Sequence, residues 1–400
     1  MILAFLAATV MSTVGTVIEV PDKDTETVRI EALVKLPTLS PIQRSLLDGI
    51  AGVFPCDTAT FSKGQINDLS GRVGQRLRAT AMDDYLRLSY EVLAPDVLTG
   101  LSMVASTLRE PTLTTSQIDL SLQALRSRRL GYWESALKLN PFLQPKYSER
   151  DITNLKTLVF RPENVTVAVV GNFTPGAPTQ RWQELEMLWT PGRLPAPEPG
   201  ADPLVKPPQS VESNLSVLEF RAQPILAKDA SLPTRLLALV ALGNGKGSSL
   251  FRIAREKLGW SYRQEAVLSP TESGFLPRLL VVESQDEVSS HDPEALRKAL
   301  LEDIVAWTDD DRKRAIGMAE ASLVRGAGPS SLYFLPSRPV TTGWEDRGFL
   351  TAYWRLKTGE AWNPYQLIGK MGFVSLEELK QTALELVTKA QAVVSNSKSG

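Results

Sequence analysis

Two stretches, one in each half of the chain, show the same order of polar and apolar positions. The first begins at Ser148 and reads SERDITNLKTLVFRPENVTVAVVGN, and the second begins at Ser375 and reads SLEELKQTALELVTKAQAVVSN. Each opens with a capping signature, Ser148 with Asp151 and Ser375 with Glu378. A helical pattern follows in each, and then an apolar run rich in β-forming residues. Each stretch therefore predicts a helix followed by a strand.

An earlier pair of stretches also corresponds. In the first half SLLDGIAGVF precedes INDLSGRVGQRLRATAMDDYLRLSYEVL, and in the second RLLALVALG precedes LFRIAREKLGWSYRQEAVL. Both place a helix before a glycine, Gly74 or Gly259, that can adopt the left-handed conformation, and then a long strand. We therefore expect two homologous α+β domains, each a mainly antiparallel sheet with helices packed over one face.

The two halves are joined by a proline-rich segment. Residues 190–210 read TPGRLPAPEPGADPLVKPPQS, with seven prolines. Such a composition is typical of a stiff extended linker. We expect an N-terminal domain over residues 16–190, a linker over 191–210, a C-terminal domain over 211–396 and a flexible tail over 397–400.

The composition excludes several classes of function. Lys and Arg total 44 against 45 acidic residues, so no net positive field is present to attract nucleic acid. The chain has one histidine, His291, and one cysteine, Cys56. These two residues cannot form a zinc site of the usual His and Cys ligands, nor an internal disulfide.

The N-terminus reads MILAFLAATVMSTVGTVIEV and carries no charged side chain before Glu19. Its apolar part has the length of a signal-peptide core, although the usual positive segment before it is missing. The run is too diluted by Ser, Thr and Gly for a transmembrane helix. We expect residues 1–15 to be a signal peptide of a periplasmic or secreted protein; the alternative is a buried first strand of a cytoplasmic protein.

A glycine-rich loop lies in ALGNGKGSSLFRIAREKLGWSY, residues 241–262. A phosphate-binding P-loop requires a hydroxyl residue directly after the lysine, where Gly247 stands, and a first glycine where Val240 stands. The sequence therefore favours a loop that leads into a helix. Gly243, Gly245 and Gly247 would let the chain turn close to a partner or substrate.

The segment REKLGWSY, residues 255–262 and preceded by SSLF, resembles the R-E-K-x-G-x-x-Y segment of the pitrilysin/insulinase and mitochondrial processing peptidase family. AMDDYLRLSYEVLAPD and RPENVTVAVVGNFTP resemble two further segments of its N-terminal domain. The resemblance covers most of residues 17–396. It implies that the two domains form half of a clam-shell.

Members of that family are similar in having a zinc-binding H-x-x-E-H helix and a glutamate ligand on a later helix. The corresponding positions here read DGIAG, residues 48–52, and the later helix, taken as Leu120 to Trp133, contains no carboxylate. The resemblance therefore implies that this chain has no catalytic residue, no metal ligand and no cofactor of its own. Zinc would be held by a partner subunit.

In relatives, an arginine and a tyrosine of the C-terminal domain hold the peptide substrate beside the metal. The resemblance carries these roles over to Arg255 and Tyr262, which we call the clamp pair. Arg255 would supply guanidinium donors and Tyr262 a phenolic O–H, groups that position a peptide and stabilise developing negative charge. The alternative is a surface arginine followed by a half-buried strand tyrosine.

Other residues favour ordinary structural roles. His291 precedes Asp292 and Pro293, which are typical of a helix start, so we expect an exposed histidine there. Nothing in the sequence brings Cys56 and His291 together as a hydrolase pair. Arg126, Arg128 and Arg129 are expected on a solvated helix face, and the aromatic residues of YWRLKTGEAWNPY (353–365) in packing.

These observations lead to two functional hypotheses. The first is a noncatalytic, substrate-positioning subunit of a heterodimeric zinc peptidase, whose partners are a family member with intact H-x-x-E-H and a peptide. The second is a purely structural scaffold, like the core subunits of the respiratory cytochrome complex in the same family. The retained clamp pair favours the first hypothesis.

Overall fold

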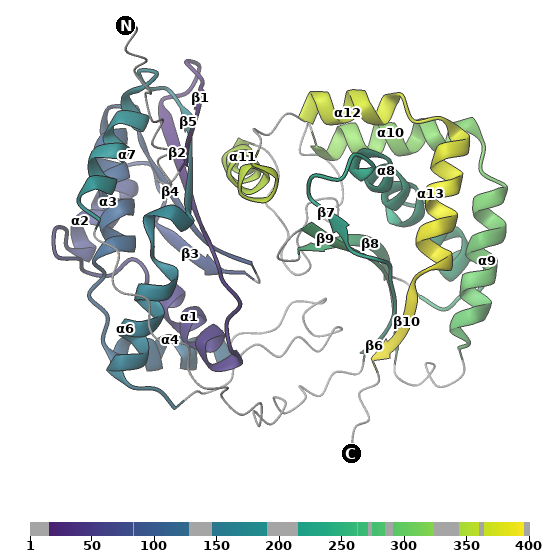
Figure 1. Cartoon of the computed structure of the whole chain (residues 1–400), viewed down its shortest axis with the longest axis horizontal. Helices are drawn as coiled ribbons and strands as arrows, with labels where there is room; N and C mark the ends of the chain where they lie inside the picture. Colours follow the sequence, from purple (N-terminus) through teal and green to yellow (C-terminus); the bar gives the residue numbers. More distant parts are fainter. Residues whose placement is uncertain are drawn as a thin grey trace, which may run out of the picture.

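The computed structural model describes residues 16–82, 84–127, 146–189, 215–261, 263–270, 274–284, 291–323, 344–359 and 364–395. Within them the chain forms two α+β units, each with a five-stranded sheet. Figure 1 shows the two sheets facing each other, with most helices on the outer sides and helix α11 between the units. The predicted fold class is confirmed. The predicted signal peptide, linker and tail lie outside the described residues, so the domain boundaries stay predictions.

The first sheet has the strand order β1-β5-β2-β4-β3. β1 pairs with β5 in parallel and all other pairs are antiparallel. Alternate residues of β2, such as Val28, Ile30 and Ala32, are fully buried beneath the outer helices. The strands are β1 Thr16–Pro21, β2 Thr27–Lys35, β3 Arg78–Ala81, β4 Tyr85–Leu93 and β5 Val165–Gly171.

The helices of the first half cover the outer face of this sheet (Figure 1). Leu101 of α3 and Leu155 of α6 belong to the same buried cluster as the strands. The elements are α1 Pro41–Val53, α2 Lys63–Gly71, η1 Ala94–Asp96, α3 Val97–Arg109, α4 Thr115–Ser127, α6 Glu149–Val159, η2 Pro162–Asn164 and α7 Ala177–Met187.

The second sheet repeats the plan of the first. Strands β10, β6, β9 and β8 are antiparallel neighbours in that order, as β5, β2, β4 and β3 are in the first sheet, and β7 pairs with the start of β9. This match of strand order supports the internal repeat that the sequence predicts. The strands are β6 Leu215–Arg221, β7 Ile225–Leu226, β8 Arg263–Pro270, β9 Gly274–Ser284 and β10 Gln391–Ser395.

The helices of the second half surround the apolar helix α8, of which most residues are buried. The elements are α8 Leu232–Gly243, the short π-helix η3 Phe251–Lys257, α9 Pro293–Val305, α10 Asp309–Leu323, α11 Trp344–Thr358, α12 Pro364–Gly372 and α13 Leu376–Thr388. No helix in the described part of the chain is long and apolar enough to cross a membrane.

The local signals at helix ends are confirmed. Ser148 and Ser375 form full capping boxes with Asp151 and Glu378, in which side chain and backbone bond in both directions. Gly259 has a φ of 70°, which is the predicted left-handed conformation. It follows Leu258, the residue at the C-cap of η3. The long strand expected after Gly74 is instead two strands, β3 and β4.

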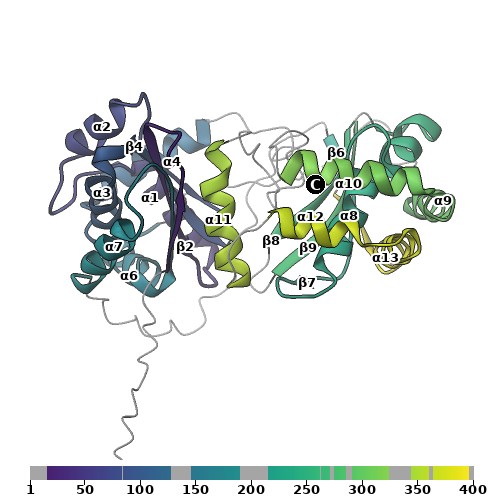
Figure 2. The ribbon, with the colours of Figure 1, turned by 90° about the horizontal axis from the view of Figure 1, so that it is seen from above.

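Helix α11 belongs to the second half in sequence but packs on the sheet of the first half. Phe349 and Tyr353 are buried in one cluster with Leu33 of β2 and Tyr85 of β4. The ring of Tyr85 lies 5.2 Å from that of Tyr353 and 5.8 Å from that of Phe349, measured between centroids. Figure 2 shows α11 beside the strands of the first unit. The sequence did not predict this second covered face, and α11 thereby ties the two halves together.

Candidate functional site

The positions that correspond to H-x-x-E-H, residues 48–52, lie on α1. Asp48 is half-buried, and Arg44 Nε lies 3.8 Å from its carboxylate. A Cβ added to Gly49 would lie 2.8 Å from Ile118 Cγ2 of α4, and one added to Gly52 would lie 2.1 Å from Ser121 Oγ. The two helices therefore touch at Gly52, one of the two positions that correspond to the family's histidines, and at the intervening residue Gly49. A larger side chain at Gly52 would therefore have to displace at least the Ser121 hydroxyl.

The later helix begins earlier than the sequence analysis placed it. α4 starts at Thr115, and Thr114 forms a reciprocal cap with Gln117. The T-x-x-Q pattern is a capping signature that could have revealed this start. The helix therefore contains one carboxylate, Asp119, which accepts a hydrogen bond of 2.7 Å from Tyr147 Oη. Residues 128–133 lie outside the described part of the chain.

Acidic, histidine and cysteine side chains do not gather into a candidate metal site. Among the described residues no group of three or more His, Cys, Asp and Glu side chains could hold a metal ion. Asp119, the carboxylate of α4, is exposed and bonded to Tyr147, on whose phenol burial and the neighbouring Asp119 carboxylate raise the pKa. The only acidic residue at positions 48–52 is Asp48.

Arg255 lies on η3, the π-helical segment Phe251–Lys257. Its side chain is exposed, and its guanidinium carbon lies 5.2 Å from the centroid of the Phe251 ring. The wide turn is visible in the hydrogen bond from Leu258 N to Ile253 O, five residues back. Single π-helical turns are rare and occur often at functional sites. Tyr262, the other member of the clamp pair, lies outside the described residues.

The glycines of the loop before η3 approach this chain's own elements. A Cβ on Gly243 would lie 2.2 Å from Ala266 N of β8, and one on Gly247 would lie 2.8 Å from Arg314 Cδ of α10. Gly245 has a φ of 78° and lies close to Met318 of α10. These glycines allow the loop to pack tightly against β8 and α10. Their approach to a partner or substrate stays a prediction.

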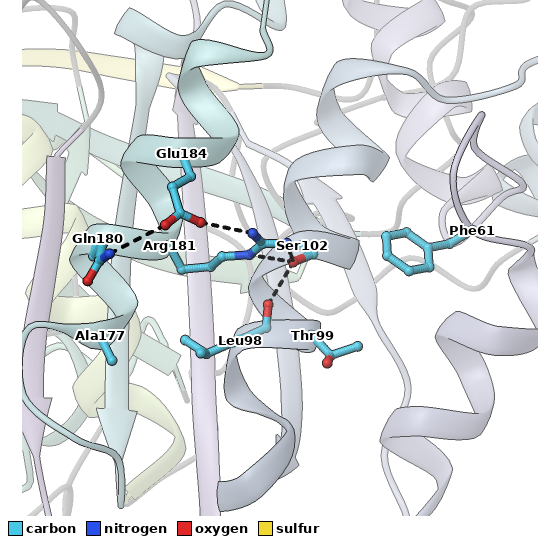
Figure 3. A pocket seen from close by; sticks show the side chains of 8 residues that line it. All are labelled: Phe61, Leu98, Thr99, Ser102, Ala177, Gln180, Arg181 and Glu184. Atoms are coloured by element: carbon cyan, nitrogen blue, oxygen red, sulfur yellow. Dashed lines mark hydrogen bonds and ion pairs between the residues drawn. The ribbon is translucent and has the colours of Figure 1, made fainter.

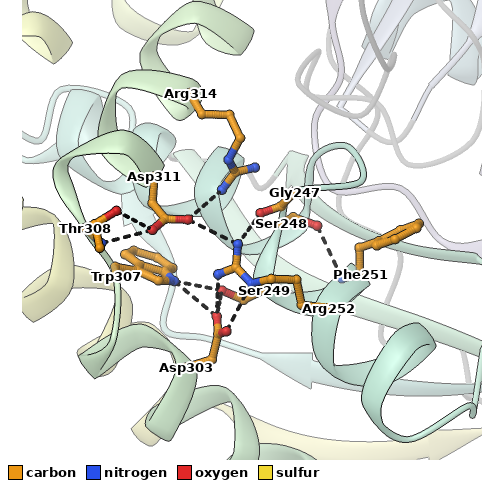
Figure 4. A network of polar contacts seen from close by, with 10 residues as sticks. All are labelled: Gly247, Ser248, Ser249, Phe251, Arg252, Asp303, Trp307, Thr308, Asp311 and Arg314. Atoms are coloured by element: carbon orange, nitrogen blue, oxygen red, sulfur yellow. Dashed lines mark hydrogen bonds and ion pairs between the residues drawn. The ribbon is translucent and has the colours of Figure 1, made fainter.

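A polar network holds the start of η3 against α9 and α10 (Figure 4). Arg252 donates to both oxygens of Asp303, at 3.1 and 2.7 Å, and to Asp311 at 3.1 Å. It also donates to the backbone oxygen of Gly247. Although burial raises the pKa of Asp303, bonds from Arg252, Ser249 and other donors lower it overall. Arg252 therefore fixes the segment on which Arg255 stands.

Ser249 adds a second layer to this network. Its buried hydroxyl donates to Asp303 Oδ2 at 2.6 Å and accepts from Trp307 Nε1 at 3.0 Å. Trp307 Nε1 also lies 3.2 Å from Asp303 Oδ2. Every polar group that faces Asp303 here is a donor, so its carboxylate is held in one orientation.

His291 differs from the expected exposed residue. It is half-buried, and its ring stacks on Trp260 with centroids 4.3 Å apart and an angle of 8° between the planes. Asp292 caps α9 by accepting from Glu294 N, as predicted. His291 thus contacts Trp260, which lies between Arg255 and Tyr262 in the sequence, by ring stacking.

Cys56 does not join His291. It is buried in the core of the first half, while His291 lies against Trp260 in the second half. Burial raises the pKa of the Cys56 thiol to about 11. A thiol in that environment is protonated at neutral pH, so the structure offers no cysteine nucleophile.

The remaining predicted groups have structural roles where they are described. Tyr353 is buried against Tyr85, which confirms packing as its role. Arg128, Arg129 and residues 360–363 lie outside the described part, and the side chain of Arg126 is not described either.

The inner face of the first sheet carries a buried charge network that the sequence analysis missed. Glu31 of β2 is fully buried and accepts two bonds from Arg87, at 2.8 and 2.9 Å, and one from Arg29 at 3.0 Å. Ser89 Oγ donates to it at 2.7 Å. Burial alone would raise the pKa of Glu31, but Arg87, Arg29 and Ser89 outweigh it and lower the pKa. α11 covers part of this network, because the Arg87 guanidinium lies 4.4 Å from the Phe349 ring centroid.

The second sheet repeats this arrangement. Glu219 of β6 is buried and bonded by Arg278 and Arg221. An isolated buried carboxylate is costly, and two arginines supply the donors that it requires. The signal in the sequence was an acidic residue inside a β-rich run, at Glu31 in TVRIEALVK and at Glu219 in LSVLEFR.

A hollow lies on the outer side, between α3 and α7 (Figure 3). It has a volume of about 500 Å³ and is lined by apolar and polar groups, among them Phe61 and Leu98. Its two charged side chains pair with each other, Arg181 Nη1 to Glu184 Oε2 at 3.0 Å, and Arg181 also donates to Ser102 Oγ. This hollow therefore contains no grouping of catalytic type.

Comparison with known proteins finds similarity to solved structures and none by sequence. No family model matches the chain, and no curated protein matches it. A crystal structure of a peptidase M16 inactive domain from Pseudomonas fluorescens resembles it with a TM-score of 0.70 and 14% sequence identity, over 96% of this chain and 95% of that chain. The fold of the two proteins is shared.

Two further solved structures resemble the chain along nearly its whole length. One is a protease from Helicobacter pylori, with a TM-score of 0.69, 15% identity, and coverage of 96% of this chain and 97% of that chain. The other is a conserved protein from Enterococcus faecalis, with a TM-score of 0.66, 11% identity, and coverage of 97% and 98%. At such identities the likeness establishes the fold alone.

Proposed function

We propose that this chain is a noncatalytic, peptide-positioning subunit of a heterodimeric zinc peptidase. A partner with an intact H-x-x-E-H motif would cleave the peptide, and Arg255 and Tyr262 would hold it beside the partner's metal. The proposal follows the sequence resemblance to the pitrilysin/insulinase and mitochondrial processing peptidase family. A shared fold with a peptidase M16 inactive domain supports the coarser part, a peptidase-like chain without catalysis.

One contrast within the chain carries the proposal. At the degenerate motif, the two histidine positions hold Asp48 and Gly52, and Gly52 packs directly on Ser121 of α4. On η3, by contrast, Arg255 is exposed while Arg252 beside it is fixed by Asp303 and Asp311. An exposed guanidinium on a segment that is held in place suits the binding of peptide carbonyls, because the backbone that carries it needs little rearrangement.

The proposed roles of the two subunits are chemically distinct. The partner would supply zinc, which polarises the scissile carbonyl and activates water. This chain would supply donors that keep the peptide backbone in the reactive geometry, a contribution that depends on position and not on proton transfer. A scaffold role without substrate contact is the alternative. Substitutions of the clamp pair distinguish the two hypotheses, because only the positioning role requires Arg255 and Tyr262.

The test of the proposal is reconstitution. The purified chain alone is expected to contain no stoichiometric zinc by elemental analysis and to hydrolyse no peptide. Mixed with a catalytic family member from the same organism, it should co-elute with that partner and raise its cleavage of a peptide library. One tightly bound zinc per chain, or peptide hydrolysis by the chain alone, would contradict the proposal.

Export from the cytoplasm is proposed with it. Strand β1 begins at Thr16 and pairs with β5, so a cut just before Thr16 would keep the sheet intact. N-terminal sequencing of the protein from its native host is expected to give a start near Thr16. A chain that begins at Met1 in the cytoplasmic fraction would refute export.

A further inference from the structure

A small polar pocket lies at the β3 edge of the first sheet. It has a volume of about 120 Å³ and is lined by Arg29, Gln75, Arg76, Arg78, Ser89 and Glu91. Since a water molecule occupies about 30 Å³ in the liquid, the pocket has room for about four waters. This is the size of a carboxylate or a phosphate group with its oxygens.

The strand register explains why these side chains meet. Arg78 of β3 is opposite Ser89 of β4, and Ser89 is opposite Glu31 of β2. The next row on the same face contains Glu91 and Arg29, which also pair across the strands. Arg76 precedes Arg78 by two residues and lines the same pocket. The pocket is therefore built on the face of the sheet that carries the Glu31 network.

The inner wall of the pocket is fixed by hydrogen bonds. Arg29 donates to Glu91 Oε2 at 3.0 Å, to Ser89 Oγ at 2.6 Å and to Glu31 Oε1 at 3.0 Å. All three guanidinium nitrogens of Arg29 are thus used, and Glu91 is neutralised by the same contact. Arg29 is nearly buried, with 11% of its side chain exposed. The wall is rigid and its charges are balanced.

The outer wall of the pocket consists of exposed side chains and carries excess positive charge. Arg76 and Arg78 are exposed, and within the described part of the chain neither has a hydrogen-bond or ion-pair partner. Four arginines on this face, including Arg87, stand against the two glutamates Glu31 and Glu91. The excess positive charge is therefore carried by Arg76 and Arg78, whose guanidinium groups are free to bind an anion.

We propose that this pocket binds one oxyanion group, a carboxylate or a phosphate, through Arg76 and Arg78. Arginine binds both groups through paired N–H donors, and the fixed wall would orient the oxygens. Two sources have this chemistry: a free inorganic anion, and the acidic side chain of a peptide that lies along the inner face. The inference does not depend on the proposed function, because the isolated chain is sufficient to test it.

The experiment is calorimetric titration of the full chain with three probes. These are inorganic phosphate and two capped peptides, Ac-Ala-Glu-Ala-NH2 and Ac-Ala-Gln-Ala-NH2. We expect saturable binding of phosphate, of the glutamate peptide or of both, and none of the glutamine peptide. Binding of phosphate alone would identify a free anion as the ligand, and binding of the glutamate peptide alone would identify an acidic side chain.

Variants of the chain test whether the anion binds at Arg76 and Arg78. The double variant Arg76→Gln/Arg78→Gln should weaken binding by at least about tenfold, because the charge-assisted hydrogen bonds of both guanidinium groups are lost. Both residues are exposed, so the variant should fold, which circular dichroism checks. Arg150→Gln, an exposed arginine on α6, is the control and should bind as the wild type does. No binding of any probe at millimolar concentration, or equal binding by the double variant, would overturn the proposal.

Discussion

Gly52 of α1 lies against Ser121 of α4 so closely that an added Cβ would come within 2.1 Å of the serine Oγ. The helix that corresponds to the catalytic motif therefore packs directly on the helix that corresponds to the one with the third ligand. Small residues at Gly49 and Gly52 permit this contact.

Restoring the motif should consequently fail. The variant Asp48→His/Ala51→Glu/Gly52→His is expected to lower Tm and to bind no zinc tightly, because the side chain added at Gly52 meets Ser121 of α4. Overpacking of a close contact costs about 1–3 kcal/mol. Thermal unfolding with and without zinc measures both effects. A variant that holds one zinc per chain at unchanged Tm would show that α1 and α4 separate easily.

A simpler pair of substitutions isolates the helix contact. Gly49→Ala should destabilise the protein, although alanine favours a helix, because its Cβ would lie 2.8 Å from Ile118 Cγ2 and 3.0 Å from Leu122 Cγ. Gly64→Ala on α2 is the matched control, since the nearest atom to its added Cβ lies 3.7 Å away. Equal stability of the two variants in urea would contradict the tight packing of α1 on α4.

The ion pair between Lys357 of α11 and Asp84 should hold the two halves together. Only 3% of the Lys357 side chain and 11% of the Asp84 side chain are exposed. Breaking a buried pair from one side costs about 3–5 kcal/mol, and we expect the lower part of that range because the pair lines a cavity of about 280 Å³ that water can enter.

Urea unfolding of Lys357→Met measures this cost. The double variant Lys357→Met/Asp84→Asn should be more stable than the single variant, because no unpaired charge stays buried. Lys313→Met, which removes an exposed ion pair with Asp309, is the control and should change stability little. A single variant as stable as this control would show that α11 is held by apolar packing alone.

Glu31 should make stability depend on pH in the acidic range. Because its folded-state pKa is lowered from 4.5, ionised Glu31 stabilises the protein above about pH 4.5, and this stabilisation is lost as pH falls through the folded value. Glu31→Gln should therefore be clearly less stable than the wild type at neutral pH, and the difference should shrink below pH 4.5. Glu256→Gln, at an exposed position, provides the comparison. A difference that is constant with pH would contradict the role of Glu31.

Arg252 should hold η3, the segment that carries Arg255, in place without contacting substrate. Arg252→Lys leaves one ammonium where a guanidinium spans Asp303, Asp311 and the backbone of Gly247. We expect a small loss of stability, since 29% of Arg252 is exposed, but faster amide hydrogen exchange over residues 251–257. Asp309→Asn, which breaks an exposed ion pair on α10, serves as control. Unchanged amide hydrogen exchange over residues 251–257 in Arg252→Lys would contradict a positioning role for Arg252.

The parts of this fold that the sequence predicts are those set by neighbouring residues. The capping boxes at Ser148 and Ser375 and the left-handed Gly259 depend on contacts within a few positions, and all three are confirmed. The start of α4 was misplaced although Thr114 and Gln117 carry the same signal. The division into two similar α+β units was predicted from the repeat, whereas the order of the strands came from the structure.

What the sequence could not reveal depends on contacts between distant residues. Nothing local to Phe349 or Tyr353 indicates that α11 crosses to the other sheet, and nothing near Arg252 indicates Asp303 as its partner. The acidic residue Glu31 inside a β-rich run was a signal in the sequence, but nothing near it indicates Arg87 of β4 as its partner. At the candidate site, the exposure of Arg255 emerged only from the structure, and Tyr262 stays a prediction.

The central claim is that this chain positions a peptide for a partner's zinc, and the clamp pair tests it most directly. The measurement is kcat/KM of the reconstituted complex with Arg255→Ala and, separately, with Tyr262→Phe. Lys257→Ala is the control, because Lys257 is exposed on the same helix and its Nζ lies 4.0 Å from Glu302. The account predicts that each clamp variant still binds the partner but loses about 10²–10³ in rate, the usual effect of removing one preorganised donor, while the control is unchanged. Cleavage at the wild-type rate with both clamp variants would contradict it and identify the chain as a scaffold.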